Sequence, residues 1–266
     1  MPGEGQWRPL GRYVNGHPAM YVSYLRPDAI HTSLVASVAW IDPRLVRAMG
    51  FAGLGQPGGT GWAHQAPIPD SMRPNLLAAF NSGFKMQDAK GGYYMDGRYA
   101  APLRPGAATV TITHNGVINV GAWDKNFSMS PNIAYARQNL NLIVNHGKVV
   151  PGVDTTSVSK WGVTVGNAVY VWRSGIGITS NGAIVYVASP GLTAASLAHL
   201  LVRAGSVRGM ELDINSAWVS FFTYSKAAPG LPASDLTVTK LLADMVPNPH
   251  RYLTPSNRDF VALFAR

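Results

Sequence analysis

A series of turn signals through the middle of the chain constrains the fold more than any other feature. In each signal a glycine lies next to Asn or His, residues that tolerate a positive φ, and short segments rich in Val, Ile and Leu lie on both sides. Tight turns of this kind join neighbouring antiparallel strands. The signals are Asn115-Gly116, Asn145-His146-Gly147, Gly166-Asn167 and Asn181-Gly182. The sequence therefore predicts four hairpins, and a mainly antiparallel sheet, between about residues 108 and 188.

Few segments have a helical pattern. Thr193 is a good cap for a helix over residues 193–204, in which leucines recur at helical spacing before a terminating glycine. An Asp-Pro pair predicts a short helix over 42–50, and a third helix is predicted over 236–245. Further strands are predicted at 19–25, 31–41, 221–224 and 260–264. Runs of strands with a few packed helices indicate an α+β fold.

The composition limits the possible partners. Charged residues make up only 13% of the 266 residues, so much of the polar surface must be Ser, Thr, Asn, Gln and Tyr, which suits sugar recognition. The net charge of +9 favours anionic partners such as phosphorylated glycans, acidic envelope surfaces or nucleic acid. There is no run of five or more Lys and Arg residues and no zinc-finger pattern, so a nucleic-acid partner is not expected.

Cysteine is absent, which excludes thiol catalysis, thiolate metal sites and disulfides. The sequence contains no stretch of 18 apolar residues and no signal-peptide pattern at its start. Two locations stay open: the cytoplasm, or the cell envelope or secreted space after removal of a targeting segment. We expect the second, because the first five residues have the character of a loop and a cysteine-free chain fits export.

One acidic residue lies in a noticeable place. Met210, Leu212 and Ile214 alternate with Glu211 and Asp213, which is the period of a half-buried strand. The predicted helix 193–204 precedes this strand and would hold it on a rigid scaffold. Asn215, Ser216 and Trp218 follow at its end. Asp213 is therefore a candidate functional carboxylate, and the alternative is an ordinary solvent-facing strand residue.

Several stretches, in order, resemble the phosphodiester glycosidase family, which includes the enzyme that uncovers mannose 6-phosphate by removing N-acetylglucosamine. They are Ala78–Phe84, Asn139–Lys148, Trp172–Ile178 with Asn181-Gly182, Gly191–Thr193 and Leu212–Trp218. The resemblance covers about residues 75–225 of one domain spanning 1–266, with N-terminal strands over 1–74 and a C-terminal extension over 226–266. Ser82, Ile214 and Asn215 replace family glycines that would let backbone approach the ligand.

The resemblance implies a hydrolase acting on a sugar-1-phosphodiester or a related glycosidic linkage. No cofactor is expected and no metal ligand is assigned, and the sequence leaves open whether a divalent ion such as Ca²⁺ is needed. Phosphate is a better leaving group than an alkoxide, so one carboxylate and one guanidinium would be enough. Asp213 would be the nucleophile, base or charge stabiliser, and Arg173 would hold the departing phosphate. Arg173 has an alternative role as a partner of Glu211. Asn81 is the third catalytic candidate.

Six further residues are candidates for substrate binding: Ser82, Asn215, Ser216, Trp218, Asp96 and Arg104. Asn-Ser-Gly and Asp-Gly are also common turn sequences, and an aromatic residue such as Trp218 usually packs in a core, so each candidate has a plain structural alternative. The seven histidines show no i, i+4 pair, so a zincin-like site is not expected. Two other functions stay open: a non-catalytic glycan-binding or envelope protein on the same fold, and a glycosidase for unphosphorylated polysaccharide. The sequence assigns no oligomeric state.

Overall fold

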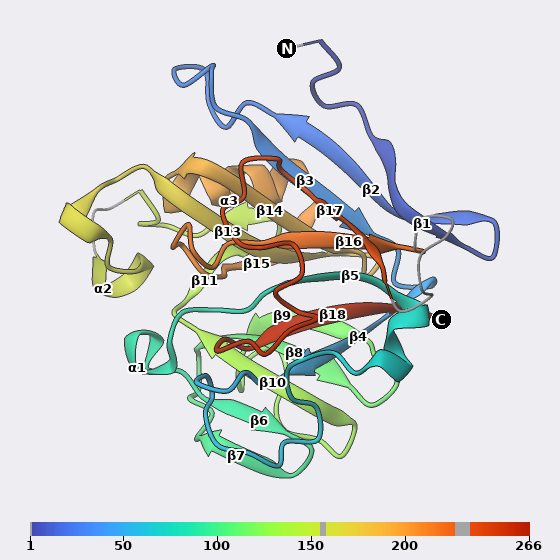
Figure 1. Ribbon diagram of the computed structural model, residues 1–266. Helices are drawn as coiled ribbons and strands as arrows, with labels where there is room; N and C mark the ends of the chain where they lie inside the picture. Colours follow the sequence, from blue (N-terminus) through green and yellow to red (C-terminus); the bar gives the residue numbers. More distant parts are fainter. Residues whose placement is uncertain (1, 155–157, 227–234) are drawn as a thin grey trace.

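The computed structural model describes residues 2–154, 158–226 and 235–266, which form three antiparallel sheets (Figure 1). The eight-stranded sheet has the order β1 (Arg8–Val14), β2 (His17–Leu25), β3 (Ala36–Ile41), β14 (Ile184–Leu192), β13 (Val171–Thr179), β15 (Ser206–Glu211), β11 (Leu142–Asn145), β12 (Lys148–Val149). The second sheet has the order β7 (Arg98–Ala101), β6 (Tyr93–Met95), β10 (Ile133–Asn139), β8 (Ala108–Thr113), β9 (Ile118–Ala122). The third has the order β17 (Thr237–Lys240), β16 (Phe221–Ser225), β5 (Leu76–Asn81), β18 (Phe260–Ala265), β4 (Val46–Phe51).

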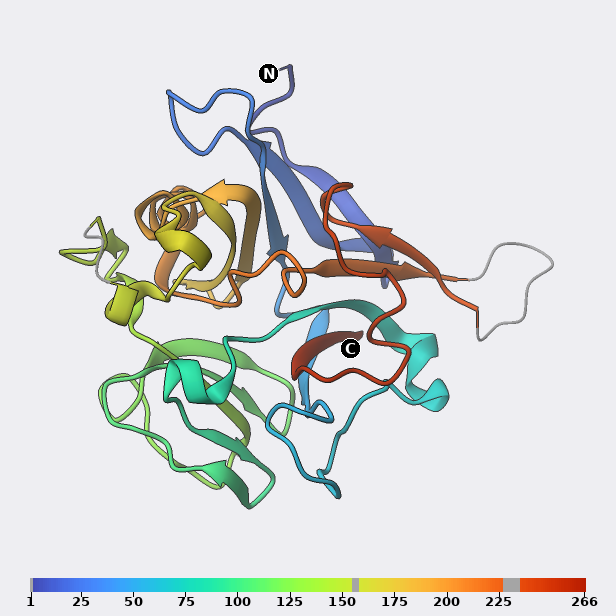
Figure 2. The same cartoon turned by 60° about the vertical axis from the view of Figure 1, so that its left-hand side comes forward.

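Each sheet packs against the other two: the third contacts β1 of the first sheet and β8 of the second, and β9 of the second contacts β13 and β15 of the first (Figure 1 and Figure 2). Met20 and Tyr186 from the eight-stranded sheet share one buried cluster with Val110 from the second sheet and Phe80 from the third. Burial of apolar surface between the sheets is therefore the main force that fixes their relative positions. The α+β class expected from the sequence, mostly antiparallel strands with few helices, is confirmed.

Three short helices accompany the sheets in the described residues: α1 (Met86–Ala89), α2 (Val158–Trp161) and α3 (Ala194–Arg203). The predicted helix is α3, and Thr193 caps it as expected: its hydroxyl accepts from the N–H of Ser196, whose own hydroxyl accepts from the N–H of Thr193. Leu197, Leu200 and Leu201 are buried where α3 packs against β13, β14, β15 and β11. No helix in the described part of the chain is long and apolar enough to cross a membrane.

Three of the four predicted hairpins are confirmed. Their turns join β8 to β9, β11 to β12 and β13 to β14. The fourth prediction, a hairpin at Gly166-Asn167, is wrong, because the structure has α2 and a 3₁₀ turn over Val165–Asn167 there. Strand β13, which follows this turn, already pairs with β14 on one edge and β15 on the other, so no edge is free for a preceding strand.

Two segments that the sequence predicts as helices contain strands in the structure. The segment predicted as a helix over 42–50 makes a turn and then enters β4, which pairs with β18 from Phe51↔Phe260 to Val46↔Ala265. The segment predicted over 236–245 contains β17, where Thr237, Val238 and Thr239 are β-branched and pair with β16. In both cases hydrogen bonds to partner strands outweigh a local helical pattern.

Gly50 permits a close approach between two sheets. A Cβ at this position in β4 would lie 2.3 Å from Cδ2 of Tyr135 in β10, which is far inside van der Waals contact. We expect Gly50→Ala to lower the free energy of unfolding by about 1–3 kcal/mol through overpacking. Denaturant unfolding measures this, and truncation of Tyr135 in the same chain should recover part of the loss. Additive losses in the double variant would contradict the contact.

Candidate functional site

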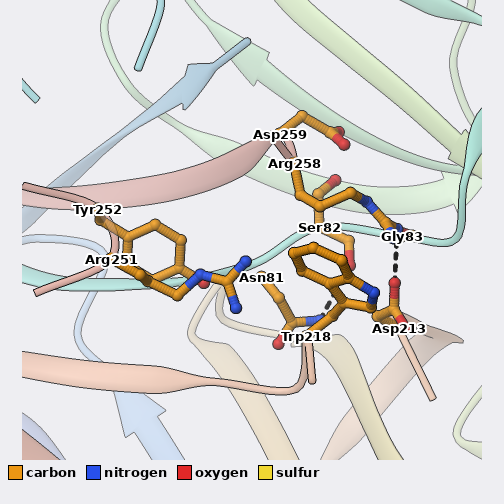
Figure 3. Close-up of a pocket in the computed structure, with 9 residues that line it drawn as sticks. All are labelled: Asn81, Ser82, Gly83, Asp213, Trp218, Arg251, Tyr252, Arg258 and Asp259. Carbon is orange, nitrogen blue, oxygen red and sulfur yellow. Dashed lines mark hydrogen bonds and ion pairs between the residues drawn. The ribbon is translucent and has the colours of Figure 1, made fainter. Parts of the chain in front are cut away.

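A narrow pocket of about 190 Å³ forms where three loops meet (Figure 3). One loop follows β5, the second joins β15 to β16 and the third joins β17 to β18. The lining residues are Asn81, Ser82, Gly83, Asp213, Trp218, Arg251, Tyr252, Arg258 and Asp259. Four of these, Asn81, Ser82, Asp213 and Trp218, were candidates from the sequence, and the structure brings them together.

Asp213 lies at the inner side of this pocket and is only 4% exposed. Strand β15 ends at Glu211, so Asp213 belongs to the loop that follows and not to the strand, which corrects the sequence-based expectation. Its backbone N–H donates to the carbonyl of Ser82 at 3.1 Å, and its carbonyl accepts from the N–H of Ser174 at 3.1 Å and from the hydroxyl at 2.8 Å. The loop is thus fixed to both β5 and β13. A solvent-facing Asp213, the alternative considered from the sequence, is wrong.

The carboxylate of Asp213 has two protein partners. Oδ2 accepts from Nη2 of Arg258 at 2.5 Å, and Oδ1 accepts from the backbone N–H of Asn215 at 2.9 Å. Burial raises the pKa of Asp213 above its usual value, and the positive charge of Arg258 opposes this rise. The carboxylate is therefore held in a fixed orientation in a largely desolvated place, which is the environment in which a single acid can be tuned for chemistry.

Arg258 is the partner that sequence reasoning missed. It lies just before β18, in the C-terminal extension and outside the stretch that carried the resemblance. Its Nη2 also donates to the carbonyl of Gly83 at 2.7 Å, while its buried Nε has no partner among the described residues. The available signal was the pair Arg258-Asp259, two charged residues at the entry to a fully apolar strand.

Two guanidinium groups lie near the ring of Trp218. The Cζ atoms of Arg258 and Arg251 are each 5.0 Å from the ring centroid, within the range of a cation–π contact. Arg251 also donates from Nη1 to the carbonyl of Ala217 at 3.1 Å, and its buried Nε has no partner in the described part of the chain. Figure 3 shows the indole between the two guanidinium groups. The mouth of the pocket is therefore positively charged and aromatic.

Other groups of the protein occupy every hydrogen-bonding position of the Asn81 side-chain amide. Nδ2 donates to the carbonyl of Ser82 and the hydroxyl of Ser174, both at 2.9 Å. Oδ1 accepts from the hydroxyl of Tyr186 at 2.8 Å and the N–H of Ser220 at 3.0 Å. An amide has two donor and two acceptor positions, so all four are engaged. This arrangement makes Asn81 a positioning residue that ties β5 to the eight-stranded sheet beneath the pocket.

Arg173 does not line the pocket. It is buried in β13, where its Nη1 donates to Oε1 of Glu211 at 2.6 Å and its Nε donates to the carbonyl of Leu192 at 2.9 Å. The alternative considered from the sequence, a partnership with Glu211, is the arrangement in the structure. Burial raises the pKa of Glu211 to about 7, and Arg173 opposes this rise.

The remaining candidates lie elsewhere. Asn215 and Ser216 line a more open groove of about 750 Å³ beside the pocket. Asp96 lines a separate cavity of about 480 Å³ between β4 and the second sheet, near His64 and His114. Arg104 is exposed and donates to the carbonyl of Ala89 at 3.2 Å.

A second buried ion pair supports the pocket from below. Nε of Arg137 donates to Oδ2 of Asp259 at 2.8 Å, and the other guanidinium nitrogens reach the carbonyls of Gln138 and Phe84. Oδ1 of Asp259 has no partner among the described residues. Within the described ranges, no group of three or more His, Asp and Glu side chains is placed to hold a metal ion.

Comparisons with known proteins show the family and the fold of the chain. The family model for phosphodiester glycosidases matches residues 74–213. The catalytic domain of zebrafish N-acetylglucosamine-1-phosphodiester alpha-N-acetylglucosaminidase, auto-inhibited by its pro-peptide, superposes with a TM-score of 0.54 at 15% identity, over 98% of this chain and 88% of that one. A protein from Synechocystis superposes with a TM-score of 0.50 at 11% identity, over 97% of this chain and 64% of that one. A search of curated protein sequences found no match.

Proposed function

The chain belongs to the phosphodiester glycosidase family, and from this premise we propose that it is a hydrolase that releases a sugar from a sugar-1-phosphodiester, with Asp213 as its essential carboxylate. The observation that carries the proposal is the Asp213–Arg258 pair at the inner end of a pocket whose mouth holds Arg251 and Trp218. Asp213 lies there with two guanidinium groups, and the other lining carboxylate, Asp259, is paired with Arg137.

In the proposed reaction the bond between the anomeric carbon and the phosphate oxygen breaks. The phosphate leaves with the electron pair, and water supplies the hydroxyl that replaces it. Asp213 stabilises the positive charge that develops at the anomeric carbon and takes a proton from the attacking water. Burial raises the pKa of Asp213, which makes it a stronger base than an exposed carboxylate.

The guanidinium groups of Arg258 and Arg251 would hold the departing phosphate. Each has a buried Nε donor with no partner in the described residues, so each can donate further hydrogen bonds. Arg173 is less suited to this role than the sequence indicated, because Glu211 and the carbonyl of Leu192 already engage it away from the pocket. Asn81 keeps its place in the proposal as a positioning residue.

A second candidate function is glycan binding without turnover. It is favoured by the occupation of both carboxylate oxygens of Asp213 by protein donors. The pocket is too narrow to admit a water molecule, so a catalytic protein must open it when substrate binds. A protein that binds a glycan only at the rim, beside Trp218 and Arg251, has no such requirement.

A substrate panel separates these functions. It contains sugar-1-phosphodiesters, aryl glycosides of the same sugars, and intact polysaccharides without a chromophore, each with and without a chelator. We expect release of sugar from at least one phosphodiester, at least ~10-fold faster than from its aryl glycoside, because the cationic mouth favours phosphate. Saturable binding of a polyanionic polysaccharide with no release over long incubation would support the second candidate instead. Preferential cleavage of unphosphorylated substrates would contradict both.

The net charge of the chain supports a proposal about its glycan partner and its location. A net charge of +9 supports an anionic or phosphorylated glycan as the partner, and peripheral contact with an acidic envelope surface. We propose on this ground that the protein acts in the cell envelope or the secreted space. Fractionation of cells that express the full-length gene tests the location: a wholly cytoplasmic protein would contradict it.

A further inference from the structure

The groove beside the pocket is apolar along most of its length. Its lining includes Val163, Val171, Trp172, Pro190 and Ile214, and its volume is about 750 Å³, which is several times that of the pocket at Asp213. No charged residue of the described chain lines it. An open, mostly apolar groove next to a pocket lined by charged side chains would match a substrate that has an apolar end and a phosphate end.

The groove and the pocket have no lining residue in common, but neighbouring residues of one loop line both. The loop after β15 contributes Asp213 to the pocket and Ile214 to the groove, and the N–H of Asn215, a residue of the groove, donates to Oδ1 of Asp213. On the other side, a Cβ on Gly162 would lie 2.7 Å from Phe84 and 3.0 Å from Ile214, so the segment before the groove packs against the loop after β5. The groove therefore begins next to the candidate carboxylate.

Exposed apolar side chains continue the groove onto the surface. Val163 is 75% exposed, Val169 52% and Tyr170 45%. Ile30, 84% exposed, belongs to the same region, because the ring of its neighbour His31 lies 4.3 Å from the ring of Tyr170. Large apolar side chains gathered at one place on a surface, and not scattered singly, mark a binding site.

We infer that this groove receives the aglycone of the phosphodiester, and that this aglycone is an apolar, lipid-like chain. The inference rests on the proposed function, since it places the phosphate at Arg258 and Arg251. The bond that breaks is unchanged, and the second product is a monoalkyl phosphate whose chain leaves along the groove. Five of the eight lining residues are apolar, none is charged, and exposed apolar side chains lie beside them, which favours an apolar chain as the occupant. The polar lining residues are Thr164, Asn215 and Ser216.

The first test needs no catalysis. Calorimetry compares binding of octyl phosphate, kept below its micelle concentration, with binding of methyl phosphate. We expect octyl phosphate to bind at least ~10-fold more tightly, because several methylene groups leave water. The variant Val163→Asp places a charge in the groove on an exposed side chain and should reduce this preference to less than ~3-fold. Val117→Asp, an exposed valine in the β8–β9 turn, should retain it.

Each result of these tests either supports or overturns the groove as the aglycone site. Equal binding of the two phosphates by the natural sequence, or an unchanged preference in Val163→Asp, would overturn the groove as the aglycone site. The second test measures hydrolysis of methyl and octyl esters of N-acetylglucosamine 1-phosphate, and a preference for the octyl ester that Val163→Asp removes supports the inference. Octyl phosphate binding without hydrolysis of any phosphodiester would remove the proposed function and leave an apolar phosphate site. Hydrolysis without a chain-length preference would remove only this inference.

Discussion

Asp213→Asn is expected to lower kcat/KM at least ~1,000-fold on the best phosphodiester of the panel while the protein stays folded. Asparagine has the shape of aspartate, and its one side-chain oxygen can still accept from either Arg258 or the N–H of Asn215, which bond to different oxygens of Asp213. It has no charge to stabilise the developing cation and cannot take a proton from water, so the loss falls on the transition state. Steady-state kinetics measures the loss, and circular dichroism checks the fold.

The control for this substitution is Asp42→Asn. Asp42 also pairs with an arginine, Arg44, but lies far along the chain from the pocket residues and does not line it. We expect unchanged kinetics in this variant. Retention of activity in Asp213→Asn would remove Asp213 from the mechanism, and the glycan-binding function would then be the better account of the pocket.

The sequence could identify Asp213 but not the form of its site. Its position after a helix and a strand is a local feature, and the resemblance pointed to the same residue. The partner of the carboxylate could not be found in this way, because Arg258 lies 45 residues further on and reaches the pocket only through the pairing of β18 with β5. Contacts that depend on such pairings leave no periodic signal in the chain.

The same distinction separates the correct and incorrect fold predictions. The turn at Asn181-Gly182 and the cap at Thr193 depend on neighbouring residues, and both are confirmed. The helix predicted over 42–50 was wrong because β4 pairs with β18, more than 200 residues away, and the helix over 236–245 was wrong because β17 pairs with the preceding strand β16. Asn81 is an intermediate case. Its position at the end of β5 could be predicted from the sequence, but the partners of its four hydrogen bonds could not, because they lie up to 139 positions away.

Arg173 is expected to contribute mainly to stability. Arg173→Met removes the partner of a buried carboxylate, and we expect it to lower the free energy of unfolding at pH 8 by about 3–5 kcal/mol. Denaturant unfolding measures this change. The control is Arg44→Met, which removes an exposed arginine from its pair with Asp42 and should change stability little.

The cost of Arg173→Met should depend on pH, and the sign follows from Glu211. Burial already raises the pKa of Glu211 from 4.5 to about 7, and loss of the opposing charge of Arg173 raises this pKa further. A carboxyl group with a raised pKa in the folded state contributes stability that is fully present below its unfolded pKa and is lost as pH rises through the folded one. Arg173→Met should therefore lower the free energy of unfolding least near pH 4.5 and most above pH 7. Above pH 7, Glu211 must either be charged without a partner or stay protonated at a pH where an exposed carboxyl is ionised. A cost that is equal at both pH values, or no larger than that of Arg44→Met, would show that the pair does not carry this stability, and Arg173 would again be open to a role with phosphate.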